Sequence, residues 1–360
     1  MIMADGEHVL VCVAWPYANG PLHLGHVAGC YLPPDICARF ERARGNRVLM
    51  VSGSDEHGTP ITVSAEQEGR NPQDIVDEYH SINTQALLDL GCTWLPNVDQ
   101  RGIDYGGSLF NRTSDPRHKV KVQENFKLLY DAGFFERRTM QQYFEVHPDG
   151  GGRFLPDRYI EGTCPTCGAD NARGDQCDEC GATYESSELN NPVSKMNPEL
   201  KVEIRDTEHL FYRLDLFQEA LELHAEKNYA VWKPNVRAMT KQWLDMGLRP
   251  RAVTRDLEWG IEVPLDSEDW GNKCIYVWFE AVQGYLTCSQ IWSETFGDSA
   301  SWEKWWMNDS TQKQRHYYFL GKDNVPFHTV IWPAIIMGLN HVRNGKSADD
   351  PIQLPQDGDL

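Results

Sequence analysis

The sequence predicts an α/β protein with a parallel sheet that is interrupted by an inserted, cysteine-rich module. Short apolar runs alternate with helical patterns near the amino end, and similar apolar runs return in the last third of the chain. Between them lie two Cys-x-x-Cys pairs in a loop-rich stretch. With 360 residues, 41% of them hydrophobic, the chain is long enough for two or three domains with a substantial core.

The amino end contains the repeating unit of a parallel sheet. Residues 8–13 are a β-branched apolar run that predicts a buried strand, and the turn signal Asn19-Gly20-Pro21 follows. A helix is expected between His23 and Gly45, with a break near residue 32 because Pro33-Pro34 interrupts it. Residues 48–52 predict the next strand, so the order is strand, loop, helix, strand.

A second helix is expected to pack on this sheet. Asn71 supplies an N-cap, Pro72 occupies the first helical position and Gly91 ends the pattern. Its apolar residues recur at helical spacing and predict the buried face: Ile75, Tyr79, Ile82, Ala86 and Leu90.

The remaining elements are expected from weaker signals. Residues 111–153 are polar with basic patches and lead into the separate cysteine module. Asp215 and Gln218 resemble a capping box, so a helix is expected after the cysteines. Residues 276–281 and 316–320 read as apolar strands that restore the α/β pattern.

The charge balance and hydropathy restrict the class of protein. Subtracting 34 Lys and Arg from 53 Asp and Glu leaves a net charge of −19, which excludes a histone-like basic binder. We expect no export signal, and the longest later apolar stretch, residues 330–339, is about half the roughly 20 residues that span a bilayer. We therefore expect a soluble, cytoplasmic protein with no membrane partner.

The cysteine spacing indicates a metal site. Cys164 and Cys167 form one Cys-x-x-Cys pair, and Cys177 and Cys180 form a second, each followed by glycine. Four thiolates match tetrahedral Zn²⁺ and leave no open ligand position, so the expected role is structural. The alternative is a redox pair or unligated thiols. The other six are expected to be packing residues: Cys12, Cys30, Cys37, Cys92, Cys274 and Cys288.

The tetrapeptide His23-Leu24-Gly25-His26 stands where the first loop enters the first helix. A helix start offers free N–H groups to a phosphate, and Gly25 lets a ligand approach the backbone. Two histidines can donate hydrogen bonds to phosphate oxygens that gain charge in a transition state. Spacing alone leaves two solvent-facing histidines as an equal alternative, and no Walker A or Gly-x-Gly-x-x-Gly pattern occurs here.

Five ordered segments resemble the class I aminoacyl-tRNA synthetases, in the form of the methionyl-tRNA synthetase family. The first runs from Ala14 to His26 and reads AWPYANGPLHLGH. The others are GSDEHGTP at residues 53–60, TRDLEWG at 254–260, YVWFEAVQGY at 276–285 and FLGKDNVPFH at 319–328. The match covers nearly the whole chain.

This resemblance implies a Rossmann-like, parallel-sheet nucleotide-binding domain that is split by a zinc-knuckle connective insertion. It also implies that methionine attacks the α-phosphate of ATP, supplied with Mg²⁺, and that the methionyl group passes to tRNA(Met). We expect the catalytic domain at residues 1–115 and 251–345, the insertion at 116–250 with its knuckle at 164–180, and a linker at 346–360.

The resemblance also assigns residues to the site. It places His23, His26 and Arg255 at the reaction, and Gly25, Gly321, Lys322 and Asp323 on ATP. Around methionine it places Trp15, Tyr17, Asp55, Trp278, Ala281, Val282, Tyr285 and His328. Without the resemblance, Trp278 and Tyr285 would be read as helix core, Asp55 as a loop cap and Arg255 as half of a surface ion pair.

The sequence departs from the family in one respect. The second signature, a Lys-x-Ser-Lys-Ser loop whose lysine stabilises the triphosphate, is missing from these 360 residues. A fragment of a longer synthetase is the favoured explanation, and a non-catalytic methionine-binding or RNA-binding relative is the alternative. The basic patches expected to meet tRNA phosphates are Arg112, Arg117, Lys119 and Lys121, and Arg249 with Arg251.

Overall fold

A computed structural model describes residues 6–94, 96–156, 159–174, 177, 179–180 and 188–360. Its main sheet has the order β14-β1-β2-β4-β3, in which β14, β1, β2 and β4 are parallel and β3 is antiparallel to β4. The strands are β1 His8–Val13, β2 Arg47–Ser54, β3 Asn97–Val98, β4 Gly106–Arg112 and β14 Gln314–Phe319. The parallel sheet predicted from the sequence is confirmed.

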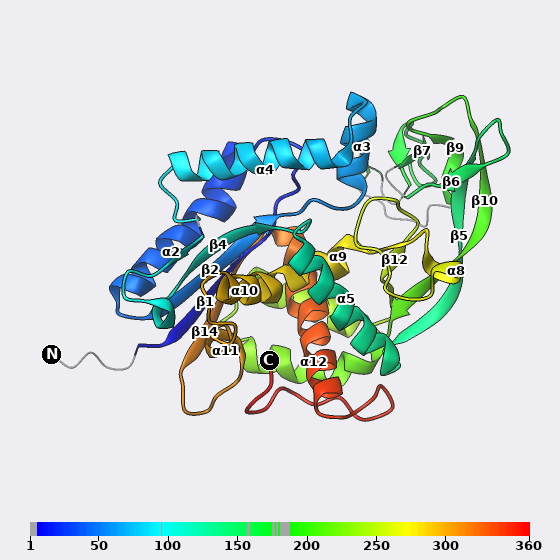
Figure 1. Cartoon of the computed structure of the whole chain (residues 1–360). Helices are drawn as coiled ribbons and strands as arrows, with labels where there is room; N and C mark the ends of the chain where they lie inside the picture. The colour runs from blue at the N-terminus through cyan, green and yellow to red at the C-terminus, as the bar shows by residue number, and fades with distance from the viewer. Residues whose placement is uncertain (1–5, 95, 157–158, 175–176, 178, 181–187) are drawn as a thin grey trace.

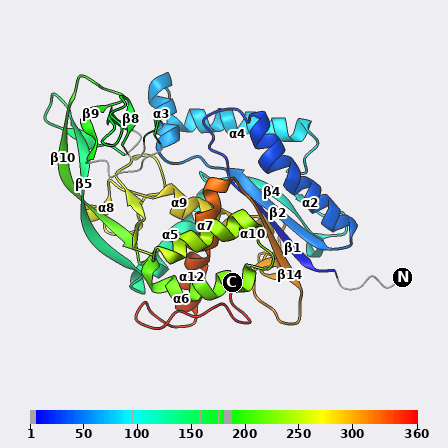
Figure 2. The same ribbon diagram turned by 180° about the vertical axis from the view of Figure 1, so that it is seen from behind.

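Helices cover both faces of this sheet (Figures 1 and 2). The helical stretch after β1 consists of α1 Leu24–His26, a π-helical turn at Val27–Tyr31 and α2 Leu32–Ala43. The chain is helical without interruption here, so the break expected near residue 32 is replaced by a change from π-helical to α-helical turns at Leu32, with prolines in the first turn of α2. On the same face lie α3 Thr59–Glu68 and α4 Pro72–Asp89.

The buried face of α4 differs from the prediction. The helix and its Asn71 cap are confirmed, but the buried residues are Ile75, Val76, Asn83 and Leu87. Ile82 and Leu90 are exposed. Ile75 is buried as predicted, and Tyr79 and Ala86 are half-buried, so the predicted face is partly right. The spacing missed Asn83 because this inward position holds a polar residue, which binds the loop at Gly20 and Leu22.

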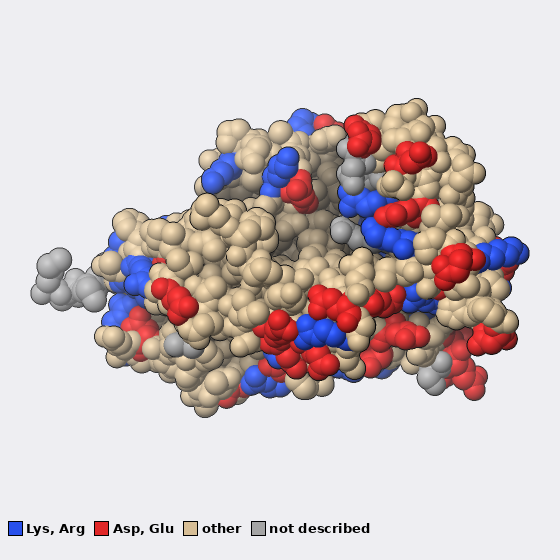
Figure 3. Space-filling model, turned by 90° about the horizontal axis from the view of Figure 1, so that it is seen from above, with Lys and Arg blue, Asp and Glu red and all other residues tan. Residues whose placement is uncertain are grey.

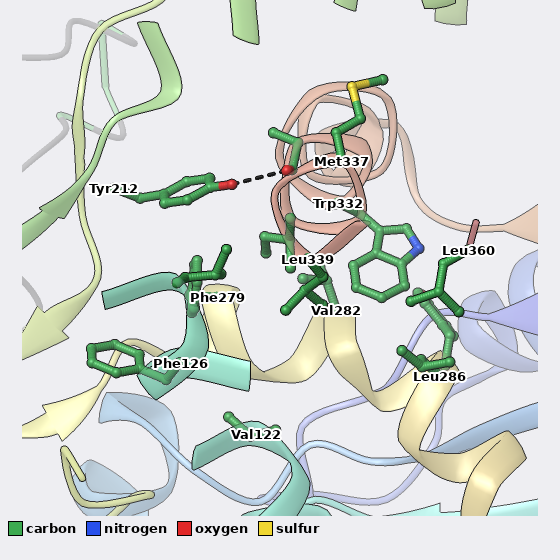
Figure 4. Close-up of a cluster of buried hydrophobic side chains, with 14 of the residues drawn as sticks. Val122, Phe126, Tyr212, Phe279, Val282, Leu286, Trp332, Met337, Leu339 and Leu360 are labelled. Carbon is green, nitrogen blue, oxygen red and sulfur yellow. Dashed lines mark hydrogen bonds between the residues drawn. The ribbon is translucent and has the colours of Figure 1, made fainter. Parts of the chain in front are cut away.

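The opposite face of the sheet carries the larger hydrophobic core (Figure 4). Strand residues alternate between the two faces, so Leu10 and Cys12 enter this core while Val9 and Val11 enter the other. Tyr212 donates a hydrogen bond to the carbonyl oxygen of Ala334 at 2.9 Å within it. The helices that supply it include α5 Pro116–Asp131, α6 Gln218–Asn228, α7 Pro234–Asp245, α10 Gly284–Thr295 and α12 Trp332–Arg343.

The inserted module is built on a long antiparallel pair of strands, β5 Phe135–Val146 and β10 Lys201–Tyr212, which pair along their whole length. These strands form the sheet β11-β10-β5-β6, and a small sheet β8-β7-β9 lies at the far end. The remaining strands are β6 Gly152–Phe154, β7 Ile160–Thr163, β8 Ala172–Arg173, β9 Asn190–Ser194 and β11 Arg251–Ala252. The sequence had shown only a polar stretch at 111–153, where α5 and β5 lie.

Two local predictions are wrong. Residues 276–281 are not a strand: β13 ends at Ile275, and α9 Val277–Glu280 follows, continued by a short 3-10 turn at Ala281–Gln283. A short apolar run fits a buried helix as well as a buried strand, and here both faces are covered. The helix α6 is present, but no side-chain cap bond forms at its start, because Gln218 binds Glu222 and the backbone of Leu244 instead.

Several short elements complete the fold. The domain boundaries expected from the sequence stay predictions. The remaining elements are β12 Thr254–Arg255, β13 Cys274–Ile275, α8 Ser267–Trp270, α11 Glu303–Trp306, 3-10 turns at Ile103–Tyr105, Leu214–Phe217 and Lys322–Asn324, and a π-helical turn at Phe327–Ile331. Leu360 is buried, and the side chain of Asn340 in α12 binds its backbone N and O. Across the described ranges, no helix combines the length and apolar character needed to cross a bilayer.

Candidate active site

The loops that follow three neighbouring parallel strands meet at the carboxyl edge of the main sheet. The amide of Asp55, just after β2, donates to the carbonyl oxygen of Pro16 at 2.7 Å, and Ala18 N donates back to Asp55 O at 2.8 Å. The amide of Ala14 donates to Phe319 O at the end of β14 at 2.9 Å. The loops after β1, β2 and β14 are thereby held together, and this edge is where open α/β sheets bind ligands.

His23 and His26 form a compact pair at the start of α1. Their rings stack with centroids 3.7 Å apart, and each Nδ1 accepts a hydrogen bond from the other residue's backbone N–H, at 3.3 and 3.4 Å. A neutral imidazole that accepts at Nδ1 carries its proton on Nε2, so both rings are arranged as donors at Nε2. Burial, followed by the neighbouring His23, lowers the pKa of His26. A Cβ at position 25 would lie 2.9 Å from the ring of His23, so a larger residue there would displace that ring from its stacked position.

Asp55 is a buried carboxylate with an unused oxygen. Its side chain is 3% exposed, and within the described part of the chain Oδ1 has no hydrogen-bond partner. Burial, and after it the charge of Glu280, raises the pKa of Asp55 well above its usual value. Burying an uncharged polar group without a hydrogen bond costs about 2–7 kcal/mol, and burying a carboxylate without a cation costs more. A structural role for Asp55 therefore does not explain its buried position.

The indole of Trp15 is clamped between two glycines. A Cβ on Gly53 would lie 2.5 Å from the ring, and a Cβ on Gly284 would lie 2.7 Å from it. The indole also stacks on the buried ring of His118 at 6.1 Å. Only hydrogen at both glycine positions leaves room for the indole, so β2 and α10 jointly set its orientation.

Tyr17 and Trp278 line a recess of about 140 Å³ together with Arg255. Tyr17 meets Trp278 edge to face at 6.4 Å, and Trp278 stacks on Phe327 at 4.3 Å. Figure 3 shows a hollow near the centre of the face seen from above, with basic side chains on one margin. The recess therefore combines aromatic walls with a cation.

Tyr285 and His328 form a partly buried, directional hydrogen-bond chain. His328 Nδ1 lies 2.8 Å from the carbonyl oxygen of Asn324, which can only accept, so Nδ1 carries the proton. Its Nε2 then accepts from the hydroxyl of Tyr285 at 2.7 Å. Burial lowers the pKa of His328 to about 4 and keeps this ring neutral near pH 7. Ala281 and Val282 are buried between α9 and α10, as packing residues would be.

Arg255 is held by its backbone surroundings rather than by an acid. Nη1 donates to the carbonyl oxygens of Thr254 at 2.8 Å and Ala252 at 3.3 Å, and the guanidinium lies 3.9 Å from the ring centroid of Tyr276. Its neighbour Asp256 turns inward to Lys273 instead. The alternative expected from the sequence, a surface ion pair of Arg255 with Asp256 or Glu258, is not formed among the described residues.

Asp256 belongs to a buried polar network that joins the insertion to the catalytic part. Lys273 Nζ binds Asp256 and also donates to Thr207 Oγ1 at 2.8 Å. His209 Nε2 lies 3.1 Å from Asp256 Oδ2, and its Nδ1 lies 3.0 Å from Thr254 Oγ1. The network fixes the strand β12 that carries Arg255.

The residues predicted for ATP lie on the neighbouring loop. Gly321, Lys322 and Asp323 are exposed and begin the 3-10 turn after β14. Because β14 pairs with β1 in parallel up to Val13 and Phe319, this loop and the loop that leads to His23 leave the same edge of the sheet. Among the described residues, no hydrogen bond or ion pair joins the two groups.

The four cysteines come together as a metal-binding cluster. Their Sγ atoms lie within 4.8 Å of one another, with Cys164–Cys180 at 3.9 Å and Cys167–Cys177 at 3.7 Å. Ligands at about 2.3 Å from a tetrahedral metal are about 3.8 Å apart, so the spacing fits one ion. Backbone amides of Thr166 and Cys167 point at Cys164 Sγ at 3.4 Å. Residues 175, 176 and 178 of the expected knuckle lie outside the described residues.

The first predicted basic patch is neutralised by acids. Arg112 binds Glu56 at 2.8 Å and Asp77 at 2.5 Å. The other three cations have acidic partners in the same way: Arg117 with Asp115, Lys119 with Glu262 and Lys121 with Glu294. An open recess of about 510 Å³ over Arg112 and Arg117 is therefore not a cationic surface. In the second patch, Arg251 lies 4.8 Å from the ring centroid of Trp243 and is exposed.

Three supporting positions were missed in the sequence. Asn83 on α4 holds the active-site loop, since its Oδ1 accepts from Leu22 N at 2.9 Å and its Nδ2 donates to Gly20 O at 3.2 Å. His57 and Glu280 pair across 223 residues at 2.5 Å. The signal available for Asn83 was a polar residue inside a helical apolar pattern, whereas nothing local predicts the His57–Glu280 contact.

Comparisons with known proteins agree with this geometry. The family described as tRNA synthetases class I (M) matches residues 9–348. Proteins named methionine–tRNA ligase from Chloroflexus aggregans and Thermoplasma volcanium are 46% and 47% identical, over 97% and 94% of this chain and 56% and 58% of their own. A solved structure of Mycobacterium tuberculosis methionyl-tRNA synthetase in complex with methionyl-adenylate aligns with a TM-score of 0.65 at 22% identity, covering 98% of this chain and 56% of that one. That likeness shows the shared fold, and the chain spans little more than half the length of these relatives.

Replacing Lys273 with methionine tests the buried network. The change leaves Asp256 without its ammonium partner in an interior position, so we expect Lys273→Met to lower the free energy of unfolding by about 3–5 kcal/mol. Lys241→Met removes a comparable but exposed pair with Asp245 and should cost less than about 1 kcal/mol. Urea denaturation measures both, and equal small losses would contradict a structural role for the network.

Proposed function

The chain belongs to the class I tRNA synthetases of the methionine type, and on that premise we propose that it binds methionine and ATP and joins them as methionyl-adenylate. In this reaction a carboxylate oxygen of methionine attacks the α-phosphorus of ATP, and pyrophosphate leaves with the electron pair of the broken P–O bond. For the whole protein we propose the family's second step, transfer of the methionyl group to the terminal ribose of tRNA(Met).

The observation that carries this proposal is the unpartnered carboxylate of Asp55 beside aromatic walls. A buried carboxylate oxygen without a donor is suited to a cationic ligand, and the α-ammonium of an amino acid supplies one. Charge-assisted hydrogen bonds of this kind contribute about 1.5–3 kcal/mol. Asp55 therefore fixes the amino end of the substrate.

The aromatic side chains suit the thioether of methionine. Sulfur contacts with aromatic rings contribute on the order of 1 kcal/mol each, and Trp15, Tyr17 and Trp278 present such rings. The hydroxyl of Tyr285, held by His328, adds a fixed polar group at the inner wall, and Ala281 and Val282 shape that wall. A pocket of fixed shape rejects amino acids whose side chains leave its polar groups unpaired.

ATP binds at the carboxyl edge of β1 and β14 in this proposal, as its magnesium complex. The two Nε2–H groups of His23 and His26 donate to phosphate oxygens, and Gly25 lets the phosphates approach the backbone. Gly321, Lys322 and Asp323 lie on the side of the adenosine and its ribose. Arg255 contributes a positive charge near the reacting groups, where negative charge develops on the phosphate.

We propose that the cysteine cluster holds one Zn²⁺ with a structural role. Cys164, Cys167, Cys177 and Cys180 would occupy all four positions of a tetrahedral site, so the metal would only hold the surrounding loops in place. The small sheet beside the cluster buries few apolar residues, and metal binding supplies folding free energy in such modules.

The main test is binding of methionine to the chain by calorimetry. We expect selective binding, and we expect Asp55→Asn to weaken it about 10-fold to 100-fold because an ammonium–carboxylate contact is lost. Asp245→Asn, at an exposed acid on α7, should leave the affinity unchanged. The analogue 4-methylthiobutanoate lacks the amino group, so its weak binding should not respond to Asp55→Asn. Equal losses for both ligands would refute the role of Asp55.

The metal content of the purified chain tests the zinc proposal. Elemental analysis should find about one zinc per chain, and Cys177→Ser should lower that ratio sharply because one of four ligands is removed. Cys37→Ser changes a cysteine outside the cluster and should leave the ratio near one. A chain that binds no zinc when refolded with the metal would contradict the proposal.

A further inference from the structure

Three ionisable side chains form a buried cluster at the end of β2, and the proposed function uses only one of them. Asp55 is 3% exposed, His57 7% and Glu280 0%. His57 Nδ1 lies 2.5 Å from Glu280 Oε1, which joins the loop after β2 to α9. The second oxygen of Glu280, Oε2, has no hydrogen-bond partner in the described ranges, just as Asp55 Oδ1 has none.

The charges of this cluster do not balance. Glu56, the residue between Asp55 and His57, is offset by the guanidinium of Arg112, whose Nε lies 2.8 and 3.0 Å from the two carboxylate oxygens. Glu280 is offset by His57. Asp55 has no cationic partner among the residues that the structure describes. Two buried carboxylates thus share one imidazolium, and the site lacks one positive charge.

The surroundings do not supply the missing charge. Lys119 on α5 acts on His57 but pairs with Glu262. His118 on the same helix is kept neutral, because burial lowers its pKa to about 3. Within the described part of the chain, Tyr31 and Glu56 also act on Asp55, and neither carries a positive charge.

Like charges that are held close together in a dry site do not both ionise. Burial, and after it the charge of Glu280, raises the pKa of Asp55 well above its usual value, which favours the protonated carboxyl. Burial alone would lower the pKa of His57, but the charge of Glu280 and the hydrogen bond to it raise the pKa above its usual value. Without a bound ligand, the net charge of Asp55, His57 and Glu280 together is then close to zero.

We propose that Glu280 and His57 are positioning residues of the substrate-ammonium site, and that the proton they leave on Asp55 is released when the ammonium binds. This inference rests on the proposed function, because it assumes that the ammonium of methionine meets Asp55. On binding, the Asp55 carboxyl loses its proton to solvent, the substrate keeps all three ammonium protons, and two carboxylates then face two cations. Binding therefore exchanges one positive charge for another and leaves the buried site neutral.

This exchange predicts a measurable proton count. Titration of the full chain with methionine, in buffers of different ionisation enthalpy, should show close to one proton released per methionine at pH 7. Affinity should then rise with pH by up to tenfold per unit, because a released proton opposes binding at low pH. The dependence should vanish above the pH at which Asp55 is already ionised in the empty site.

Glu280→Gln separates this role from a purely structural one. The change removes the charge that opposes ionisation of Asp55, so the pH at which proton release falls to half should shift downward, and the affinity should depend less on pH. Glu280→Asp keeps the charge and should retain the release. Glu226→Gln, at an exposed acid on α6, is the matched control and should behave as the wild type.

The outcomes are distinct. Binding without proton release between pH 6 and 8, or release that Glu280→Gln does not shift, overturns the inference and leaves the proposed function standing. Absence of methionine binding by the folded wild type overturns the proposed function itself. Thermal unfolding shows whether Glu280→Gln folds. If it does not fold, the proton release of the wild type and of Glu280→Asp tests the inference.

Discussion

The site depends on one constraint: the carboxylate of Asp55 is buried at the end of a central parallel strand, and no cation pairs with it among the described residues. Backbone hydrogen bonds between Asp55 and the loop at Pro16 and Ala18 hold its main chain in place, and its side chain is buried. The same loop carries Trp15 and Tyr17 on one side of Asp55 and leads to the histidine pair on the other. A ligand with an ammonium, an apolar sulfur-bearing chain and a carboxylate next to a triphosphate fits this order of groups.

Contacts from the surrounding helices and strands hold the irregular loops of the site in place. The active-site loop has little regular structure of its own, but Asn83 from α4 binds both Gly20 and Leu22, and Gly53 and Gly284 hold the indole of Trp15. On the insertion side, β12 is held by the Lys273–Asp256–His209 network. Rigid helices and strands therefore set the positions of side chains that lie on loops, as binding sites on α/β sheets require.

Local sequence signals predicted the features that depend on residues close together in the sequence. The strands at β1, β2 and β14, the helical irregularity at the start of α2 and the meeting of the four cysteines follow from periodicity, proline and spacing. The same reasoning failed at residues 276–281, where an apolar run is a buried helix, and at α4, where Asn83 occupies the inward face. Tyr285–His328 and His57–Glu280 lie 43 and 223 residues apart, so only the folded chain, or for the first pair the family's motifs, brings them together.

The central claim is that Asp55 receives the amino group of methionine in a buried site. A crystal structure of the chain with bound methionine tests it most directly. We expect the substrate nitrogen within about 2.7–3.1 Å of Asp55 Oδ1, with the thioether against Trp15 and Trp278. Methionine bound with its nitrogen elsewhere, while Asp55 Oδ1 still has no partner, would contradict the account.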